Sequence, residues 1–314
     1  MYNFCTLFNS NYLTRGLAMY ESLKKHAGNF RLFIFAFDDL CCKLLKELNL
    51  ESVEVISLKE FENEALLKVK PARSAAEYCW TCTPATIKYC IETFNLDNCT
   101  YVDADLYFYS DPAVLIEEMG QKSVLLTEHR YTPKYDCTKN SGIYCVQFMT
   151  FKNDQNGMKA LNWWYEACLD WCYARVEDGK FGDQKYLDDW TERFAGVHVL
   201  QHKGGGVAPW NIQQFDVFAP DFNLVFYHFH DLKFLENEKI DLGRYKLRKE
   251  EIEKLYIPYL KHLDNVMRRM QKFETNYDFH GTTKTGKDLL TLYREFKRHF
   301  NGSYNIFRKS ELLT

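Results

Sequence analysis

The sequence has no long apolar run, no strong excess of charge of one sign and no low-complexity tract. No stretch approaches the roughly 18 apolar residues of a membrane span, and the N-terminus starts with a strand-like run and lacks a signal-peptide pattern. Because 40 Lys and Arg residues nearly balance 43 Asp and Glu residues, the net charge is only −3, which gives no overall field to attract nucleic acid. These absences predict a cytoplasmic globular protein that does not bind nucleic acid.

A second paired-cysteine motif is also missing. Cys79 and Cys82 form one C-x-x-C motif, whereas a zinc site normally combines two such pairs. The 11 cysteines are scattered through expected strands and helices, which suits buried thiols in a reducing compartment better than a disulfide framework. We therefore expect no zinc or redox role for this motif.

The sequence does contain enough apolar material for a large core. Its 314 residues are 46% hydrophobic and 16% aromatic, which suits one large or two modest domains. The first hundred residues alternate between strand and helix patterns, as an open α/β sheet does, and residues 30–37 are apolar at nearly every position, which favours a parallel sheet covered on both faces. Strands are expected at residues 2–8, 30–37, 53–57 and 99–102, and helices at residues 14–26, 44–48, 59–68 and 84–94.

The pattern is less regular in the middle of the chain and changes again near residue 240. Strands are expected at residues 124–127, 144–151, 197–200 and 224–229, and helices at residues 157–173 and from residue 181. The polar loop at residues 130–139 is expected to be a mobile lid. We therefore divide the chain into a domain at residues 1–240 and a helical extension at residues 241–314.

The extension is expected to form basic helices at residues 249–276 and 287–300. The first of them carries an apolar stripe along one face, formed by Leu255, Tyr259, Leu263, Val266 and Met270. Such a stripe normally docks on the parent domain. The alternative is that a basic amphipathic helix lies on an anionic membrane surface.

Two carboxylates, Asp103 and Asp105, come directly after the expected strand at residues 99–102. Alternation along an extended chain points them the same way, so both can face one point in space. Two like charges this close need a counter-charge or a shared proton, and Mg²⁺ or Mn²⁺ would supply that charge through oxygen ligands. The alternative is a polar strand end followed by a turn at residues 110–112. Asn9, Asp38 and Asp39 also follow strands, and the carboxyl ends of parallel strands are where ligands bind in such sheets.

Five motifs occur in order over roughly residues 1–235. They are Asn-Ser-Asn-Tyr at residues 9–12 with Ser-Leu at 22–23, Tyr-Val-Asp-Ala-Asp-Leu-Tyr at 101–107, Gly-Asp-Gln at 182–184, Trp-Asn at 210–211 and Tyr-His-Phe-His at 227–230. Together they resemble the retaining GT-A glycosyltransferases of the glycogenin and lipopolysaccharide-galactosyltransferase type. The resemblance implies an α/β GT-A fold, which is Rossmann-like with a mostly parallel open sheet and flanking helices, followed here by the C-terminal helical extension.

The resemblance also implies an activity. It is the metal-dependent transfer of a sugar, with retention of configuration, from a nucleotide-diphosphate sugar, expected to be UDP-linked, to an acceptor hydroxyl. A cytoplasmic chain with basic C-terminal helices suits bacterial surface-glycan assembly at the inner face of the membrane. The expected acceptor is a glycan or a lipid-linked molecule, and the C-terminal helices are expected to contact the membrane peripherally.

Site residues follow from the same resemblance. Asp103, Asp105 and His228 would hold Mn²⁺ or Mg²⁺, and Asp183 and Gln184 would lie beside the donor sugar and acceptor as the catalytic pair. The nucleotide sugar would contact Phe8, Asn9, Asn11, Tyr12, Arg73, Asp103, Ala104, Asp105, Asn211 and Lys233. Trp80, Trp210 and Tyr131 are candidates for stacking on sugar rings.

Each role has a simpler alternative. Asn9, Asn11 and Asp183 could be turn or helix-capping residues, His228 a packed histidine at a strand end, and Lys233 a solvated side chain.

The sequence departs from the family pattern at three places. Asp231 stands where the family has Gly, and Phe234 follows Lys233 where the family has Pro. A rival histidine motif begins at His202, and His230 is a further alternative to His228, which we prefer for its separation from Asp183. The family's early Arg in the helix before the acidic strand is replaced by Thr83 and Thr86, so Arg73 or Lys88 would have to contact the sugar.

Three other functions remain open. An inverting GT-A transferase would need a carboxylate base, for which Asp183 or Glu128 could serve. A nucleotidyltransferase would carry a Gly-rich, basic loop after the first strand. The run at residues 9–11 is neither Gly-rich nor basic. A non-catalytic sugar-nucleotide-binding protein of the same fold would have no need to retain Asp103, Asp105, Asp183 and His228.

Overall fold

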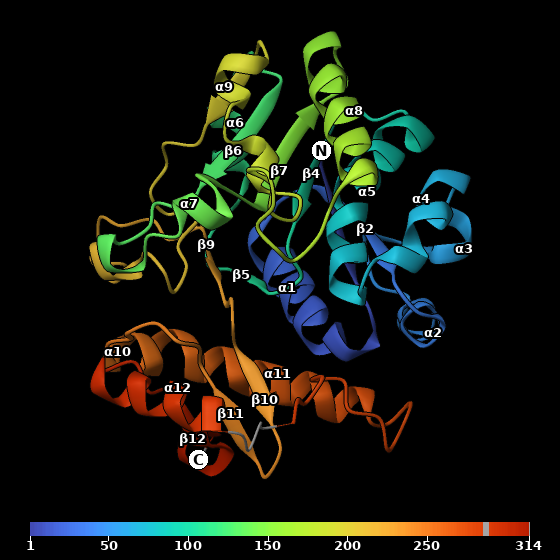
Figure 1. Cartoon of the computed structure of the whole chain (residues 1–314). Helices are drawn as coiled ribbons and strands as arrows, with labels where there is room; N and C mark the ends of the chain where they lie inside the picture. Colours follow the sequence, from blue (N-terminus) through green and yellow to red (C-terminus); the bar gives the residue numbers. More distant parts are fainter. Residues whose placement is uncertain (285–288, 314) are drawn as a thin grey trace.

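The computed structural model describes residues 1–284 and 289–313, and its centre is a seven-stranded sheet in the order β3-β2-β1-β4-β7-β6-β8 (Figure 1). The strands are β1 (Tyr2–Phe8), β2 (Phe30–Ala36), β3 (Val53–Ser57), β4 (Asn98–Val102), β6 (Val124–Glu128), β7 (Tyr144–Lys152) and β8 (Val197–Val199). Strands β3, β2, β1 and β4 are parallel, β7 is antiparallel to both of its neighbours, and β8 is parallel to β6. The predicted open, mostly parallel α/β sheet is confirmed.

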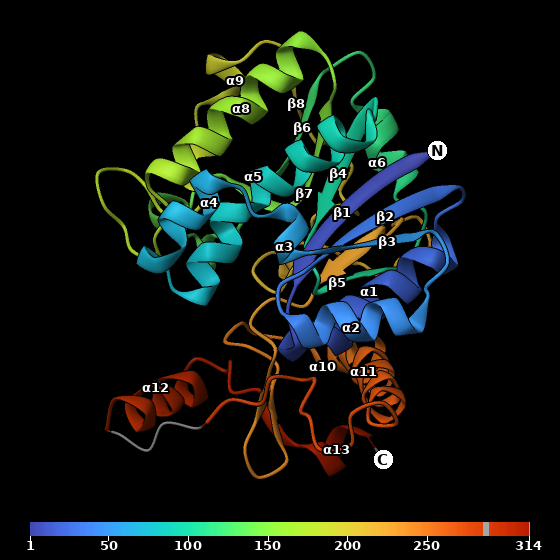
Figure 2. The same ribbon diagram turned by 90° about the vertical axis from the view of Figure 1, so that its right-hand side faces the viewer.

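Both faces of this sheet are buried, as the apolar run in β2 predicts. Phe33 and Phe35 point into one core, and Leu32 and Ile34, the residues that alternate with them, point into another. The first core is covered by α5 (Ala75–Phe94) and α8 (Gln155–Asp170), and the second by α1 (Leu13–His26), α2 (Asp39–Leu48) and α11 (Ile257–Met270) (Figure 2). The shorter helices are α3 (Leu58–Phe61), α4 (Glu64–Val69), α6 (Ala113–Glu118), α7 (Thr138–Ser141) and α9 (Trp190–Arg193).

Helix α5 begins earlier than the sequence predicts. Pro84 was expected to start this helix, but it lies inside, because Ser74 and Glu77 form a capping box that begins the helix at Ala75. The helix expected at residues 59–68 is divided into α3 and α4, since Asn63 accepts a hydrogen bond from the Leu66 N–H and starts a new helix. The helix expected from residue 181 is only a 3-10 turn at Lys185–Leu187, followed by α9.

Two small sheets and the C-terminal helices complete the fold. Strand β5 (Leu106–Phe108) pairs with β9 (Phe226–His228), and β11 (Lys239–Asp241) pairs with β10 (Lys233–Leu235) and β12 (Ile306–Arg308). The helices are α10 (Lys249–Glu251), a π-helical stretch (Ile252–Tyr256), α11, α12 (Leu289–Phe300) and α13 (Lys309–Leu313). The helix expected at residues 249–276 therefore ends at Met270. Of the second helix, expected at residues 287–300, residues 287 and 288 lie outside the described residues. A domain boundary at residue 240 stays a prediction.

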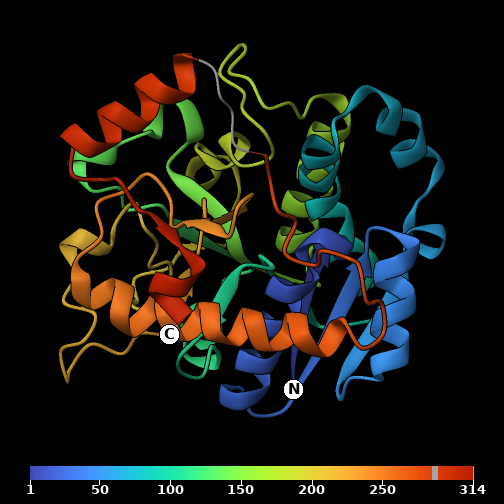
Figure 3. The same ribbon diagram turned by 90° about the horizontal axis from the view of Figure 1, so that it is seen from below.

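The apolar stripe of the C-terminal helices is buried. Leu255, Tyr259, Leu263, Val266 and Met270 are each at most 1% exposed, and α11 packs against α1 (Figure 3, orange against blue). Docking on the parent domain is thus confirmed for this stripe, which cannot at the same time face a membrane. Among the described residues, no helix combines the length and apolarity that crossing a bilayer requires.

Candidate active site

The acidic pair and a distant histidine are brought together by the small β5–β9 sheet. Asp103 follows β4, and its N–H donates to the Gln147 carbonyl oxygen on β7 (3.0 Å). The chain then turns into β5, whose Leu106 is the pairing partner of His228 at the end of β9. The Phe229 N–H donates to the Asp105 carbonyl oxygen (3.1 Å), which completes this junction. Pairing between segments over a hundred residues apart therefore places the imidazole beside both carboxylates.

The geometry of this cluster fits a divalent cation. His228 Nε2 lies 3.1 Å from Asp105 Oδ1 and 3.8 Å from Asp103 Oδ2, and the ligand atoms of all three residues lie within 4.8 Å of one another. In an octahedral site with bonds of about 2.1 Å, neighbouring ligand atoms are about 3.0 Å apart. Two carboxylates and one imidazole are also a donor set that suits Mn²⁺ or Mg²⁺. The chain's own residues thus fit the metal that the sequence predicts.

Gln147 orients the histidine of the cluster. Its Oε1 accepts a hydrogen bond from His228 Nδ1 (2.7 Å), which leaves Nε2 directed at the carboxylates. Gln147 is fully buried, and its Nε2 has no hydrogen-bond partner among the residues that the structure describes. Gln147 is not among the residues predicted from the sequence, although a glutamine inside a mostly apolar strand at residues 144–151 is a usable signal.

The pKa values of the two carboxylates are shifted in opposite directions. Burial raises the pKa of Asp103 to about 6, with the charge of Asp105 adding to the effect. Burial also disfavours the Asp105 carboxylate, but its contact with His228 outweighs that effect and lowers the pKa of Asp105 to about 2. Burial disfavours the imidazolium as well, yet the two carboxylates raise the pKa of His228 well above its usual value. In the metal-free protein the imidazolium therefore acts as the counter-charge.

Asp183 and Gln184 lie on the same cavity wall, after the turn at Gly182. The Trp164 indole N–H donates to the Asp183 carbonyl oxygen (2.8 Å) and fixes the backbone there. The Asp183 side chain is 5% exposed, and burial, followed by the charge of Asp103, raises its pKa to about 7. Gln184 Nε2 donates to the Ser141 carbonyl oxygen (2.8 Å) of α7. The helix cap that was the alternative for Asp183 does not form, since no helix begins at this residue.

These groups line a cavity of about 1340 Å³. Most of the predicted site residues lie on its wall: Phe8, Asn9, Tyr12, Asp103, Ala104, Asp105, Asp183, Gln184, His228 and Lys233. The three aromatic candidates Trp80, Trp210 and Tyr131 line it too, and the Trp210 ring lies edge-on to His228. The structure thus gathers the predicted nucleotide, metal and catalytic residues around one space large enough for a nucleotide sugar.

Three predicted contact residues do not line this cavity. The side chain of Asn211 is fully buried and bonds to the backbone at Gly206, His129 and Ala208, so it shapes the wall from behind. Arg73 donates to the Leu169 carbonyl oxygen (3.3 Å) and lies over the Tyr173 ring. Asn11 Oδ1 accepts a hydrogen bond from the Tyr277 hydroxyl (2.8 Å).

The alternative residues for these roles lie elsewhere. His202 Nδ1 accepts a hydrogen bond from the Gly204 N–H (3.1 Å), away from the carboxylates, and Lys88 pairs with Glu92. His230 lines the cavity but is not part of the three-residue cluster. Glu128, the alternative base, does not line the cavity. Asp38 caps α2 and binds Ser10 instead of joining the metal cluster.

The C-terminal extension supplies part of the cavity wall. This contribution is not predicted from the sequence. Its contributing residues are Asp241, Arg244, Tyr245, Lys297, Arg298, Asn301 and Ser303. Arg298 makes two hydrogen bonds to the Asp241 carboxylate (2.7 and 2.6 Å), which tie α12 to β11. No motif of the family covers these residues, so the sequence offered no signal for them.

Comparison with known proteins places the fold. No family model matches the sequence. Two proteins of Bacillus subtilis (strain 168) are similar to it along most of their length: the uncharacterized protein YfnD is 29% identical over 275 residues, covering 83% of this chain and 88% of YfnD, and the uncharacterized protein YfnF is 28% identical over 291 residues, covering 88% and 96%. Among solved structures, the galactosyltransferase LgtC in complex with donor and acceptor sugar analogues superposes with a TM-score of 0.50 at 11% identity, over 84% of this chain and 95% of LgtC. The sheet, its flanking helices and this likeness together show that the chain has the GT-A fold that its sequence predicts.

Proposed function

We propose that this protein is a glycosyltransferase that moves a sugar from a nucleotide-diphosphate sugar, UDP-linked, to an acceptor hydroxyl. The observation that carries the proposal is the cluster of Asp103, Asp105 and His228 on the wall of a large cavity that also contains Asp183 and Gln184. The GT-A fold adds support, because LgtC, which has it, is a galactosyltransferase. Fold alone does not assign an activity, so the proposal rests on the site.

The cluster is proposed to bind the diphosphate end of the donor. Asp103, Asp105 and His228 would hold Mn²⁺ or Mg²⁺, which supplies charge neutralisation for the departing diphosphate. The Lys233 ammonium lines the cavity and is 52% exposed, so it is free to turn from Asp231 toward a phosphate oxygen. Phe8, Asn9 and Tyr12, which follow β1 on the same wall, would contact the nucleoside.

Asp183 and Gln184 are proposed to act at the sugar. Both lie on the cavity wall with the metal cluster, and Gln184 is held by the backbone of α7. In the family that the sequence resembles, the matching residues lie beside the donor sugar and the configuration is retained. An inverting reaction is the second candidate, because the raised pKa of Asp183, about 7, suits a general base that deprotonates the acceptor.

The proposal is tested by UDP release from a panel of UDP-sugars with and without Mn²⁺. Wild type is expected to release UDP only with the metal, and the Asp103→Asn/Asp105→Asn double variant to lose at least 100-fold in rate. Asp170→Asn is the matched control, because this carboxylate is 81% exposed and does not line the cavity. Full activity in the double variant would refute the enzyme proposal, and metal-independent binding without turnover would favour a sugar-nucleotide-binding protein. The anomeric configuration of the product separates retention from inversion.

We also propose that α12 contacts the membrane near a lipid-linked acceptor, as a surface-glycan enzyme at the inner face of the membrane requires. Tyr293, Phe296 and Phe300 are 62%, 69% and 86% exposed on this helix, at helical spacing. Lys297, on the same helix, lines the cavity, so a membrane bound here would lie close to the proposed active site. In co-sedimentation with anionic liposomes, Phe296→Ser/Phe300→Ser should bind at least fivefold less than wild type. Equal binding by the two proteins would exclude this contact.

A further inference from the structure

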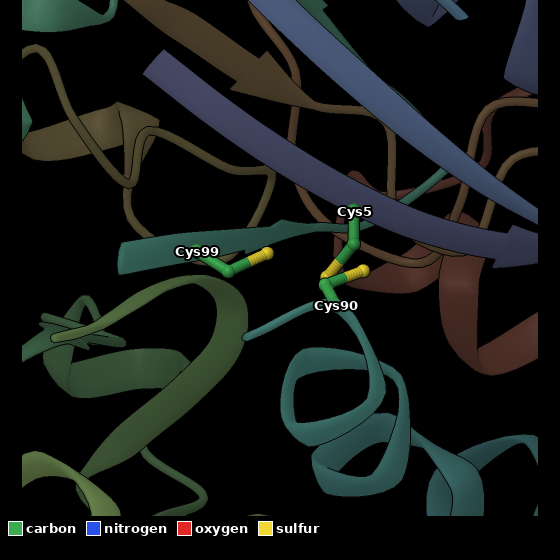
Figure 4. Close-up of side chains that lie close together, drawn as sticks. All are labelled: Cys5, Cys90 and Cys99. Carbon is green, nitrogen blue, oxygen red and sulfur yellow. The ribbon is translucent and has the colours of Figure 1, made fainter. Parts of the chain in front are cut away.

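A cluster of three thiols lies in the core, apart from the proposed active site. Cys5 on β1, Cys90 on α5 and Cys99 on β4 are each fully buried and unpaired by disulfides. Their sulfurs lie within 4.8 Å of one another, and Figure 4 shows the three side chains converging from the two strands and the helix. None of them lines the large cavity.

The fold explains why these cysteines meet. Strands β1 and β4 are parallel neighbours, with Cys5 opposite Tyr101, so Cys99, which lies two residues before Tyr101, points to the same face of the sheet. Helix α5 covers that face and contributes Cys90. Each sulfur is therefore held by a rigid element, which is how a preorganised ligand site is built.

We propose that Cys5, Cys90 and Cys99 form a three-thiolate site for a thiophilic metal or metalloid ion of trigonal coordination. With bonds of about 2.3 Å, three sulfurs around one ion lie about 3.4 to 4.0 Å apart, depending on whether the site is pyramidal or planar. The sulfurs, which lie within 4.8 Å of one another, need to approach by at most about 1.4 Å to reach this geometry. Thiolates are soft ligands and select soft ions over Mg²⁺ or Ca²⁺.

The surroundings favour a trivalent ion over zinc. The part of the chain that the structure describes adds no fourth His, Cys, Asp or Glu to this group, and all three cysteines are fully buried, so bulk solvent has no direct access to complete a tetrahedron. Three thiolates with a divalent ion would leave a net negative charge in the core, which is costly to desolvate, whereas a trivalent ion leaves the site neutral. Arsenic(III) meets both conditions.

The binding reaction is a condensation without redox change. Arsenous acid reacts with the three thiols so that three As–O bonds break and three As–S bonds form. The three thiol protons leave with the three hydroxyl groups as water. Entry requires a local opening, for which the end of α5 and the start of β4 are suited, because Cys90 and Cys99 lie on either side of the short connection between them.

The test uses arsenite with the full chain. After incubation and desalting, wild type is expected to retain arsenic, measured by mass spectrometry of the element, and Cys90→Ser to retain at least tenfold less at the same free arsenite. Cys145→Ser is the matched control, since Cys145 is a buried cysteine outside this group and its variant should bind as wild type does. Equal retention by wild type and Cys90→Ser would overturn the proposal.

A second measurement needs no variant. X-ray absorption at the arsenic edge on the loaded wild-type chain should show three sulfur neighbours and no oxygen. Two sulfurs with one oxygen would place the arsenic at a pair of cysteines instead, and would also overturn the proposal. Neither experiment depends on sugar transfer, so their outcome is independent of the proposed function.

Discussion

Among single residues, Gln147 has a larger role than its place in an apolar strand suggests. It holds the Nδ1 side of His228 and so decides that Nε2 faces the two aspartates. Partners of this kind keep a histidine in the tautomer and orientation that a metal needs. Gln147 is therefore a positioning residue, which acts on the proposed metal only through His228.

We predict that Gln147→Leu weakens Mn²⁺ binding by 10- to 100-fold, because an apolar side chain of similar size cannot accept the His228 N–H. Isothermal titration with Mn²⁺ measures this directly. Gln147→Glu keeps an acceptor and should bind at least tenfold more tightly than Gln147→Leu. Gln121→Leu, at an exposed turn, is the control that should match wild type. Wild-type affinity in Gln147→Leu would show that His228 needs no such support.

Asp183 makes the stability of the metal-free protein depend on pH. Its pKa is raised to about 7 from an ordinary value of 3.8. The folded protein therefore keeps a proton on Asp183 that the unfolded chain releases. The contribution of this group to the free energy of unfolding is fully present below about pH 4 and is lost as the pH rises to 7. The loss is on the order of 4 kcal/mol at most.

Asp183→Asn should remove this dependence, since an amide stays neutral. In urea unfolding with a chelator present, we expect the free energy of unfolding of wild type to fall between pH 5 and pH 8 by about 2 to 3 kcal/mol more than that of the variant. The exposed carboxylate in Asp170→Asn provides a comparison that should follow wild type at both pH values. If the free energy of unfolding of Asp183→Asn changed between pH 5 and pH 8 by as much as that of wild type, the assignment to Asp183 would be contradicted.

Among the elements, α12 is tied to the small C-terminal sheet by an ion pair. The Arg298 guanidinium donates to both oxygens of Asp241 on β11 and also to the Gly243 carbonyl oxygen (2.7 Å). The Arg298 and Asp241 side chains are only 17% and 13% exposed, so removing one partner leaves the other charge buried and unpaired.

We predict that Arg298→Leu releases α12 while the central sheet stays folded. Hydrogen exchange within α12 should become at least tenfold faster in the variant, and exchange in β1 and β4 should be unchanged. Lys297→Leu is the control on the neighbouring residue, whose ammonium is not part of the Asp241 pair. Unchanged exchange in α12 would show that other contacts hold this helix.

For the whole molecule, binding at the cluster should appear as thermal stabilisation that depends on pH. Mn²⁺ at 100 times its dissociation constant adds about 2.7 kcal/mol to the free energy of unfolding. His228 and Asp103, whose pKa values are raised, must shed their protons to bind the ion, so affinity increases with pH. The melting temperature should therefore rise by several degrees with Mn²⁺ at pH 7.5 and by less than half as much at pH 5.5. Asp105→Asn should show no rise at either pH.

The sequence predicted the parts of this molecule that follow from local pattern. Alternating apolar segments predicted the parallel half of the sheet, and the positions of Asp103 and Asp105 just after a strand predicted their convergence. His228 came from resemblance to a family, because its approach depends on pairing between β5 and β9, which leaves no local signal. For Asn211 the motif match was misleading. It could not reveal that the side-chain amide is already hydrogen-bonded to backbone groups. The cavity residues after residue 240 depend on packing between distant segments.

The β5–β9 pair also sets the order in which this chain can become competent during its synthesis. The two aspartates leave the ribosome long before His228, and β12, which completes the last sheet, follows later still. A nascent chain can fold β1 to β4 with their helices early, yet it cannot assemble the three-residue cluster until translation has passed residue 228. An interrupted chain would therefore have a folded sheet with two unmatched carboxylates at its edge, and the proposed capacity to hold a cation would appear only after β9 has been made.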